Sequence, residues 1–421
     1  MKELNYPKEN LIILGHQLKS LRMKRDFSLR GVSNAVNISV SVISDIENGK
    51  TIANLMTLET LYQAIDIKLF IDLTALTEYF EKMMRFYDAF YHKDMNEMTR
   101  LITEITRVES LLENSPLMVE LALLKATFMT ANSNPLTAQQ LKQLDDWYAV
   151  MSTPQKQRCN IAHGCNYLIK NDYQKALSIL TLNLELSANR KAHAITLEHL
   201  ADAASRSFLQ HKVIKYASEA SRLHGLFNCV YRKIATDLTL VKGLIFAREF
   251  EEANDVLATV DYLIQNDIRF IDFLDLFHIY KAYLENNQNK YYDVIKTLTP
   301  IKTNDARALV LKAKAYYKLN DFQSLSTVLN TLTSDETRLQ APVYYHVGTV
   351  MKSAVEDNIP PIVRDESLMY LMDNPDKLLN PDLLSFAYEF MIDIFTQNND
   401  LDNLSRLSKQ LINFSDLRKN N

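Results

Sequence analysis

The stretch that most constrains the fold of this chain is residues 28–50, SLRGVSNAVNISVSVISDIENGK, which predicts two short helices joined by a tight turn. Ser28 and Ser39 are good helix N-caps, because a serine hydroxyl accepts a hydrogen bond from an unpaired N–H of the first turn. Asn37 lies between the helices and tolerates the left-handed conformation that a sharp turn needs. Asn48-Gly49 then ends the second helix. Two helices so joined predict a helix-turn-helix, whose second helix fits the major groove of DNA.

Apolar spacing predicts which sides of these two helices are buried. The inward positions are Val32, Ala35, Val36, Val42, Ile43 and Ile46. The outward side of the second helix then carries Val40, Ser41, Ser44 and Asp45. This side has no Arg or Lys, so the helix offers no bidentate contact to guanine, whereas hydroxyls can contact bases or phosphates and Val40 can meet a thymine methyl group.

The sequence around this motif resembles the Xre/Cro-type repressor domain over about residues 10–66. The resemblance rests on Leu14-Gly15 upstream, on IENGK at 46–50, and on three leucines at 55, 58 and 61. It implies a small helical bundle that binds DNA, and we expect its basic side chains to contact phosphates. The expected DNA-binding residues are Lys19, Arg22, Arg25, Arg30, Ser39, Val40, Ser41, Ser44 and Lys50.

Composition predicts an all-α chain. There are only seven Gly among 421 residues, and most stretches show a period near 3.6. The length allows two or more domains, and 47% hydrophobic with 23% charged residues is an ordinary soluble balance. Residues 1–70 hold nine Lys+Arg against seven Asp+Glu, or +2, so the net charge of −4 leaves about −6 for the remainder. This asymmetry favours DNA contact at the N-terminal end.

The cysteines favour a reducing compartment and give little support for a metal site. Cys159, Cys165 and Cys229 are an odd number without a paired framework, as is typical of the cytoplasm. Cys159, His163 and Cys165 lie close in sequence, but no fourth ligand stands at a useful spacing, so a partly buried helix face is the favoured interpretation. We expect no signal peptide and no membrane-spanning segment. The prediction is a cytoplasmic protein without metal or cofactor.

From about residue 78 the chain repeats a helical hairpin. In the clearest copy, Arg158–Leu180, Gly164 lets two helices approach closely, Tyr167 packs over the contact, and Asn171-Asp172 makes the turn. This order resembles the tetratricopeptide pattern. Further turns are expected at 92–94, 210–212, 248–249, 289–290, 320–321 and 399–400. Two more fit the same period at 132–135 and 358–361, which gives about nine hairpins. Hairpins of this kind bury their apolar faces only by stacking, so we predict a right-handed α-solenoid.

The predicted domains are a helix-turn-helix head at 1–66, a connecting helix at 67–80, and a repeat body at 81–421. No Gly/Ser-rich linker separates head and body, so we expect helix packing to couple them. The first helix of each hairpin is expected to line the concave surface.

A head of this kind on a tetratricopeptide body resembles the RRNPP family of peptide-pheromone receptors (Rap, Rgg, NprR, PlcR and PrgX). The resemblance implies a short signalling peptide in the groove, held partly by Asn side chains, and a body that forms a homodimer. Asn166 and Asn286 are candidate counterparts, and the hairpin register adds other positions. The expected peptide-binding residues are Arg158, Asn166, Asp202, Lys242, Asn286, Arg307 and Lys314.

Two functions follow from these features. The first is a DNA-binding transcriptional regulator whose operator binding is set by a small peptide. The second is a scaffold that binds a protein partner, with a weak DNA-binding head, as the lack of basic residues on the second motif helix permits. An enzyme is not expected, because the sequence has no phosphate-binding Gly loop, no H-E-x-x-H and no G-x-S-x-G motif.

Overall fold

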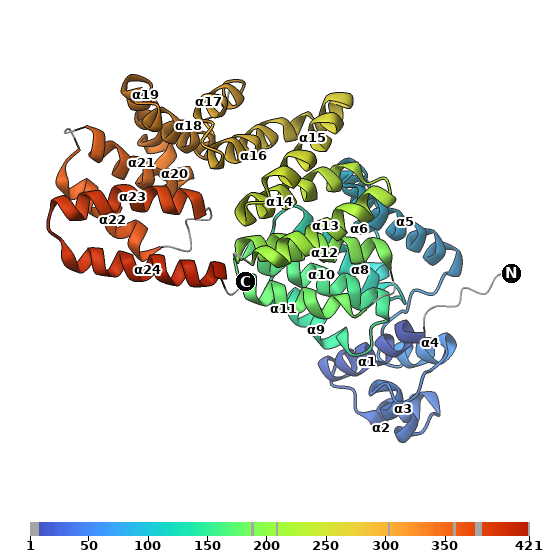
Figure 1. The fold of residues 1–421 in the computed structure, drawn as a ribbon. Coiled ribbons are helices and arrows are strands. Elements are labelled where there is room, and N and C mark those ends of the chain that lie inside the picture. The colour runs from blue at the N-terminus through green and yellow to red at the C-terminus, as the bar shows by residue number, and fades with distance from the viewer. Residues whose placement is uncertain are drawn as a thin grey trace. The chain divides into compact units, whose positions relative to one another are not determined.

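The computed structural model describes residues 8–186, 189–207, 209–301, 304–356, 359–374 and 381–419 (Figure 1). Within these ranges the chain forms 24 α-helices and one 3-10 helix, with no strand. The all-α prediction is therefore confirmed. Across the same ranges, none of the helices is both long and apolar enough to cross a bilayer.

The N-terminal head contains the predicted helix-turn-helix. Its helices are α1 (Lys8–Lys24), α2 (Leu29–Val36), α3 (Val40–Glu47) and α4 (Leu55–Gln63). The Ser28 hydroxyl accepts from the Gly31 N–H at 2.9 Å, and the Ser39 hydroxyl caps α3 through the Val42 N–H at 3.3 Å. Asn37 adopts a left-handed φ of 56° between the two helices. The local signals in the sequence thus set both ends of each motif helix.

Two of the six predicted inward positions are exposed. Val32, Ile43 and Ile46 are buried as expected, but Val42 is 42% exposed and Ala35 is also exposed. Val42 lies at the edge of the apolar stripe, in the first turn of a helix only eight residues long. The outward face of α3 is therefore more apolar than the sequence pattern predicted.

The body consists of nine consecutive helix pairs among the described residues, and the predicted α-solenoid of about nine hairpins is confirmed (Figure 1). The pairs are α5 (Leu73–His92) with α6 (Met95–Thr106), α8 (Met118–Ala131) with α9 (Ala138–Tyr148), α10 (Thr153–Ile169) with α11 (Tyr173–Leu184), α12 (Arg190–Arg206) with α13 (Gln210–Leu226), α14 (Val230–Ala247) with α15 (Phe250–Asn266), α16 (Leu274–Asn287) with α17 (Tyr291–Leu298), α18 (Ala306–Lys318) with α19 (Phe322–Leu332), α21 (Pro342–Val355) with α22 (Pro361–Asp373), and α23 (Pro381–Gln397) with α24 (Leu401–Lys419). Short α7 (Glu109–Leu112), η1 (Ile268–Phe273) and α20 (Asp335–Gln340) lie between pairs.

Most hairpin turns use one non-glycine residue in the left-handed region. These residues are Lys93, Asn171, Arg248, Asn289, Asn320 and Asn399, all at predicted turns. One turn was placed wrongly, because Leu209 N–H donates to Ala204 O at 2.9 Å and α13 already begins at Gln210. That turn therefore precedes the predicted residues 210–212.

The predicted connecting helix at 67–80 is not a separate element. Ile65, Ile67 and Leu69 are buried while Asp66 and Lys68 are exposed, an alternation with the period of an extended chain rather than of a helix. Asp72 then caps α5, which runs on as the first helix of the first hairpin.

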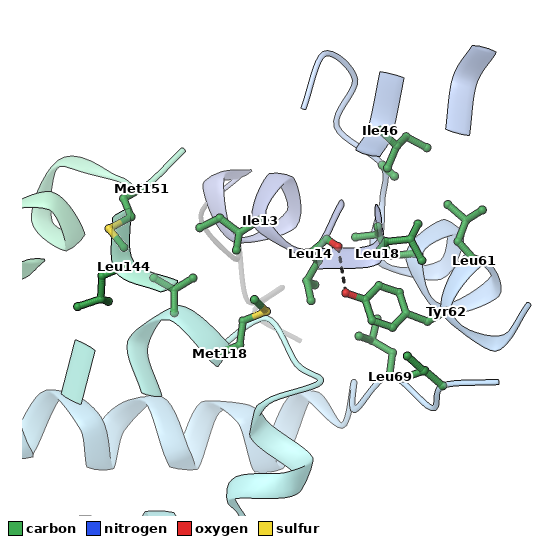
Figure 2. Close-up of a cluster of buried hydrophobic side chains, with 14 of the residues drawn as sticks. Ile13, Leu14, Leu18, Ile46, Leu61, Tyr62, Leu69, Met118, Leu144 and Met151 are labelled. Carbon is green, nitrogen blue, oxygen red and sulfur yellow. Dashed lines mark hydrogen bonds between the residues drawn. The ribbon is translucent and has the colours of Figure 1, made fainter. Parts of the chain in front are cut away.

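The described chain divides into two compact units, one of residues 1–203 with 219–233 and the other of 204–218 with 234–421. The first unit includes the whole head, so the predicted domain boundary at residue 66 is the end of the head but not the end of a compact unit. The reason is a shared core (Figure 2). Ile13 and Leu14 of α1 belong to the same buried cluster as Met118, Leu144 and Met151 of the body.

Candidate DNA-contact face and groove cavity

The outward face of α3 presents hydroxyl and methyl groups to solvent. Ser39, Val40 and Ser41 are exposed, and the Ser39 and Ser41 hydroxyl oxygens lie 3.0 Å apart. Ser44 is half-buried on the same helix. The N-terminal residues of a recognition helix are those that reach base edges. Chemically, this face can make hydroxyl hydrogen bonds and apolar contacts in a major groove, without any cation of its own.

Arg22 is not available for the phosphate contact predicted from the sequence. Its side chain is buried, and Nε and Nη2 donate to the two carboxylate oxygens of Glu47 at 2.6 and 2.9 Å. Nη1 also donates to Phe27 O at 2.7 Å. The hydrogen bond to Glu47 raises the pKa of the Arg22 guanidinium. Arg22 is therefore a structural residue that joins α1 to the end of α3.

The remaining basic residues of the head have different surroundings. Arg30 and Lys50 are exposed next to the motif helices. Lys19 Nζ donates to Asn48 Oδ1 at 2.8 Å, close to the end of α3. Arg25 Nη1 donates to the carbonyls of Ile65 and Asp66 at 3.1 and 3.0 Å, which ties Arg25 to the chain after α4.

A cavity of about 180 Å³ lies in the first unit, and its lining comes largely from the first helices of four consecutive hairpins. Those helices are α5, α8, α10 and α12. The lining includes Tyr87, Asp88, Gln157, Arg158 and Lys191. Arg158 is the one predicted peptide-binding residue in this lining. We call this space the groove cavity.

Polar groups in the groove cavity are left without partners. Tyr87 Oη, Gln157 Oε1 and Arg158 Nε are buried and make no hydrogen bond within the described chain. Burial raises the pKa of Tyr87, so its hydroxyl stays protonated and can donate. The Arg158 guanidinium lies 4.4 Å from the centroid of the Tyr87 ring. The cavity thus combines two unused donors with one unused acceptor, which complements the C=O and N–H of peptide groups.

The cavity lining also carries formal charges. Lys191 Nζ pairs with Asp88 at 2.6 Å and lies 5.0 Å from the Tyr91 ring centroid. Arg158 in turn pairs with the buried Glu120 at 2.7 Å, so the charges in and around the lining offset one another. The unused Arg158 Nε and the Tyr87 hydroxyl still favour a ligand that brings an oxygen acceptor.

Asn166 does not lie on an accessible surface. Its side chain is fully buried, and Oδ1 accepts from the Leu136 N–H at 2.9 Å. The amide oxygen thus stabilises the loop before α9, while Nδ2 is buried without a hydrogen-bond partner. Asp202 lies half-buried in the same compact unit.

The other four predicted peptide-binding residues belong to the second unit. Asn286 is buried, with its Oδ1 lacking a hydrogen-bond partner. Arg307 pairs with Asp305 at 2.6 Å, and Lys314 lies 5.1 Å from the Phe386 ring centroid. Lys242 is half-buried in α14. None of these four lines the groove cavity.

Sequence reasoning missed Tyr87, Gln157 and Lys191. A usable signal existed for Tyr87, because Met84, Tyr87 and Tyr91 recur at helical spacing along α5. These residues fall at the start of the predicted repeat body, and no groove position was assigned to them. The clustering with α10 and α12 depends on tertiary packing.

The Cys159, His163 and Cys165 side chains are packed in α10. Burial raises the pKa of both thiols to about 12, so they remain protonated and are poor metal ligands. His163 Nε2 lies 3.4 Å from Asp145 Oδ1. In the described part of the chain, no three His, Cys, Asp or Glu side chains gather in a way that could hold a metal ion.

Comparisons with known proteins agree with this geometry. Residues 13–67 match the model of a helix-turn-helix domain. A Rap protein complexed with Competence and Sporulation Factor has a TM-score of 0.64 at 13% identity, covering 82% of this chain and 100% of its own. The resemblance to the RRNPP receptors is confirmed at the level of the fold.

Two structures of NprR extend the comparison. NprR in complex with its cognate peptide NprX has a TM-score of 0.60 at 13% identity, covering 80% of this chain and 99% of its own. The apo form of NprR from B. thuringiensis has a TM-score of 0.59 at 14% identity, covering 81% and 99%. No curated protein matches the sequence. At these identities the likeness concerns the fold alone.

Proposed function

We propose that this chain is a DNA-binding transcriptional regulator whose operator binding is controlled by a short peptide in the groove cavity. The observation that carries the proposal is the packing of the helix-turn-helix head and the cavity-forming hairpins into one compact unit. A ligand that changes the packing of α8 or α10 therefore acts directly on the surface against which the head rests. Such a ligand can shift DNA binding only if its affinity differs between the arrangement of the head that binds DNA and the arrangement that does not.

The chemistry of the cavity supports a peptide as the ligand. Unused donors on Tyr87 and Arg158, and an unused acceptor on Gln157, match the alternating C=O and N–H groups of a peptide backbone. The similar NprR and Rap structures were each solved with a bound peptide or factor, as described above. This parallel supports a peptide over a nucleotide or metabolite.

DNA contact would use the outward face of α3 with the exposed cations around it. Arg30 and Lys50, with Lys19 beside Asn48, would position the phosphates, while Val40 and the α3 hydroxyls would meet base edges. We propose that the protein works in the cytoplasm as a homodimer, whose two heads bind half-sites about one helical turn apart. It has no catalytic role in this proposal.

One observation favours a second candidate, a scaffold that captures a protein partner. The outward face of α3 carries no Lys or Arg, so its affinity for DNA depends on a few neighbouring cations. In that reading the solenoid binds a folded protein and the head contributes little.

The deciding experiment is a two-stage binding assay on the full chain. A pool of random DNA duplexes is first selected for binding to the protein. Binding of the tightest selected duplex is then measured at increasing concentrations of the best binder from a pool of short random-sequence peptides. A typical coupling changes DNA affinity by about 5–150-fold. A change below about twofold with every peptide, together with capture of a folded protein, would replace the regulator with the scaffold.

A further inference from the structure

Buried hydrogen bonds join the groove cavity to the first helix of the head. Arg158 Nη2 donates to Glu120 Oε1 at 2.7 Å. Gln155 Nε2 donates to the same Glu120 oxygen at 3.1 Å and to Asn10 Oδ1 at 3.1 Å. Arg158 and Gln155 lie on α10, Glu120 on α8 and Asn10 on α1. The path therefore runs from the cavity lining, through two hairpins, into the head.

The three inner residues are almost fully buried. Asn10, Gln155 and Glu120 are 2%, 1% and 3% exposed. Hydrogen bonds in such low-dielectric surroundings are stronger than in water, and leaving one of their groups unpaired costs the full desolvation of that group. Losing a hydrogen bond at one end of this path therefore changes the energy of the hydrogen bonds at the other end.

Gln155 is fixed by its own local structure. Its Oε1 accepts from the Ser152 N–H at 3.0 Å, as part of the capping box at the start of α10. Its amide nitrogen has two N–H groups, and each has a partner, Glu120 in one case and Asn10 in the other. The side chain therefore has no unused donor and cannot turn without breaking bonds at both ends.

The Arg158 end of the path is incomplete. Arg158 Nε and Glu120 Oε2 are both buried without a hydrogen-bond partner, and Arg158 lines the groove cavity. A carbonyl or carboxylate in the cavity can complete the hydrogen bonding of the guanidinium, as an oxygen acceptor matches both Arg158 and the Tyr87 hydroxyl. A ligand oxygen that draws the guanidinium further toward Tyr87 also lengthens its bond to Glu120, because one side chain serves both.

We propose that Glu120 and Gln155 are positioning residues that transmit the state of the groove cavity to the head. When a peptide oxygen draws Arg158 away from Glu120, the buried carboxylate depends on Gln155 alone. An unpaired buried charge is costly, so Gln155 is pulled toward Glu120 and its bond to Asn10 weakens. The docking of α1 then changes. This mechanism rests on the proposed function and adds to it the route of regulation and the chemical class of the triggering group.

The test measures coupling rather than activity alone. For wild-type full chain, the affinity of the selected DNA duplex is measured without peptide and with the best binder of the random peptide pool, and the ratio of the two is the coupling. Asn10→Leu removes the head acceptor, and Glu120→Gln removes the charge but keeps an oxygen for Gln155. We expect the ratio to fall from about 5–150-fold in the wild type to below about twofold in each variant, with peptide binding to Asn10→Leu retained.

The matched control is Gln140→Leu. Gln140 occupies the same position in the capping box of α9 as Gln155 does in α10, but no hydrogen bond links it to the head. Gln140→Leu removes polar contacts of a neighbouring helix without touching the path to the head, so the coupling ratio should stay at the wild-type value even where stability falls. A wild-type ratio in Asn10→Leu and Glu120→Gln would overturn the proposal, while leaving the proposed function in place.

A second measurement needs no variant. Hydrogen exchange of the wild-type chain is recorded with and without the same peptide, and with its C-terminally amidated form. Peptide should change the protection of α1 amides, and amidation should abolish the change if the triggering oxygen is the terminal carboxylate, or preserve it if it is a main-chain carbonyl. Unchanged α1 protection on peptide binding overturns the relay. Failure of the wild type to bind any peptide or duplex instead overturns the proposed function and the relay with it.

Discussion

At the scale of single residues, the head depends on one buried ion pair. Arg22 and Glu47 are both buried, and their fork-like pairing leaves few of their charged atoms without a partner. Breaking such a pair by removing one partner leaves an uncompensated charge, whereas replacing both with apolar groups is often tolerated. The pair therefore fixes the position of α3 against α1 more than it adds net stability.

The first prediction is that Arg22→Met destabilises the head by about 3–5 kcal/mol, because Glu47 is left buried and unpaired. The double variant Arg22→Met with Glu47→Leu should recover most of that loss. Urea unfolding followed by circular dichroism measures both. Arg30→Ala is the surface control and should change stability by no more than about 0.5 kcal/mol. Equal losses for Arg22→Met and Arg30→Ala would show that the pair has no structural role.

The second prediction concerns Val40 on the exposed face of α3. If its methyl groups meet a thymine methyl, replacing that thymine by deoxyuridine in the selected duplex removes one buried methyl. The loss should be about 0.8 kcal/mol, or roughly fourfold in Kd. In Val40→Ala the same base change should have a smaller effect. If no thymine position responds in the wild type, Val40 does not read the base edge in this way.

At the scale of elements, the α10–α11 hairpin depends on a close helix approach at a glycine. A Cβ added to Gly164 on α10 would lie 2.5 Å from Leu180 of α11, inside van der Waals contact. A Cβ added to Gly225 on α13 would meet only the side chain of Lys233, at an ordinary 3.7 Å. These two helical glycines therefore separate the effect of packing from that of helix propensity.

The third prediction is that Gly164→Leu overpacks the α10–α11 contact and costs roughly 1–3 kcal/mol. Gly225→Ala should instead be neutral or stabilising, by up to about 1 kcal/mol, because alanine is the better helix former. Thermal unfolding of the full chain compares them. A Gly164→Leu protein with the wild-type melting temperature would mean that α10 and α11 do not pack as described.

At the scale of the whole molecule, long-range polar contacts tie distant hairpins of the first unit together. Arg232 on α14 is fully buried, and its Nε and Nη2 donate to the carbonyls of Tyr91 and Phe90 at 2.6 and 2.8 Å. Its Nη1 lies 2.8 Å from both carboxylate oxygens of Glu198 on α12. One side chain thus connects the end of α5 to α12 and α14.

The fourth prediction follows from Glu198. Burial by itself would raise the pKa of this carboxyl, but Arg232 and His224 lower it overall. Its stabilising contribution is therefore present above the unfolded-state pKa of about 4.3, and is lost as the pH falls toward the lower folded-state value. In Arg232→Met the buried carboxylate keeps only His224 as a partner, its pKa should rise, and stability should instead fall as the pH increases.

Urea unfolding of wild type and Arg232→Met between about pH 3 and pH 7 measures these slopes. The variant should also be less stable near neutral pH by about 3–5 kcal/mol. Parallel pH profiles for the two proteins would contradict the role given to Arg232. The exposed Arg222 is a suitable control, since its ion-pair partner among the described residues is Glu219 on its own helix.

The sequence by itself determined what is local along the chain. Helix periods, the Ser28 and Ser39 caps, and the left-handed Asn at successive turns act within about four residues, so the helix-turn-helix and the number of hairpins could be predicted. The structure corrected the one turn and the one connecting segment where that local signal was weak.

Only the tertiary structure decided which predicted side chains have access to a ligand. The sequence pattern predicted Arg22 as a phosphate contact, whereas in the structure it pairs with Glu47, 25 residues away. Asn166 was predicted in the groove, but it packs against a loop 30 residues distant. The groove cavity needs four helices, and the bond from Gln155 to Asn10 spans 145 residues. Burial and pairing depend on groups far apart in the chain, and the periodicity of the sequence does not predict which of these groups meet.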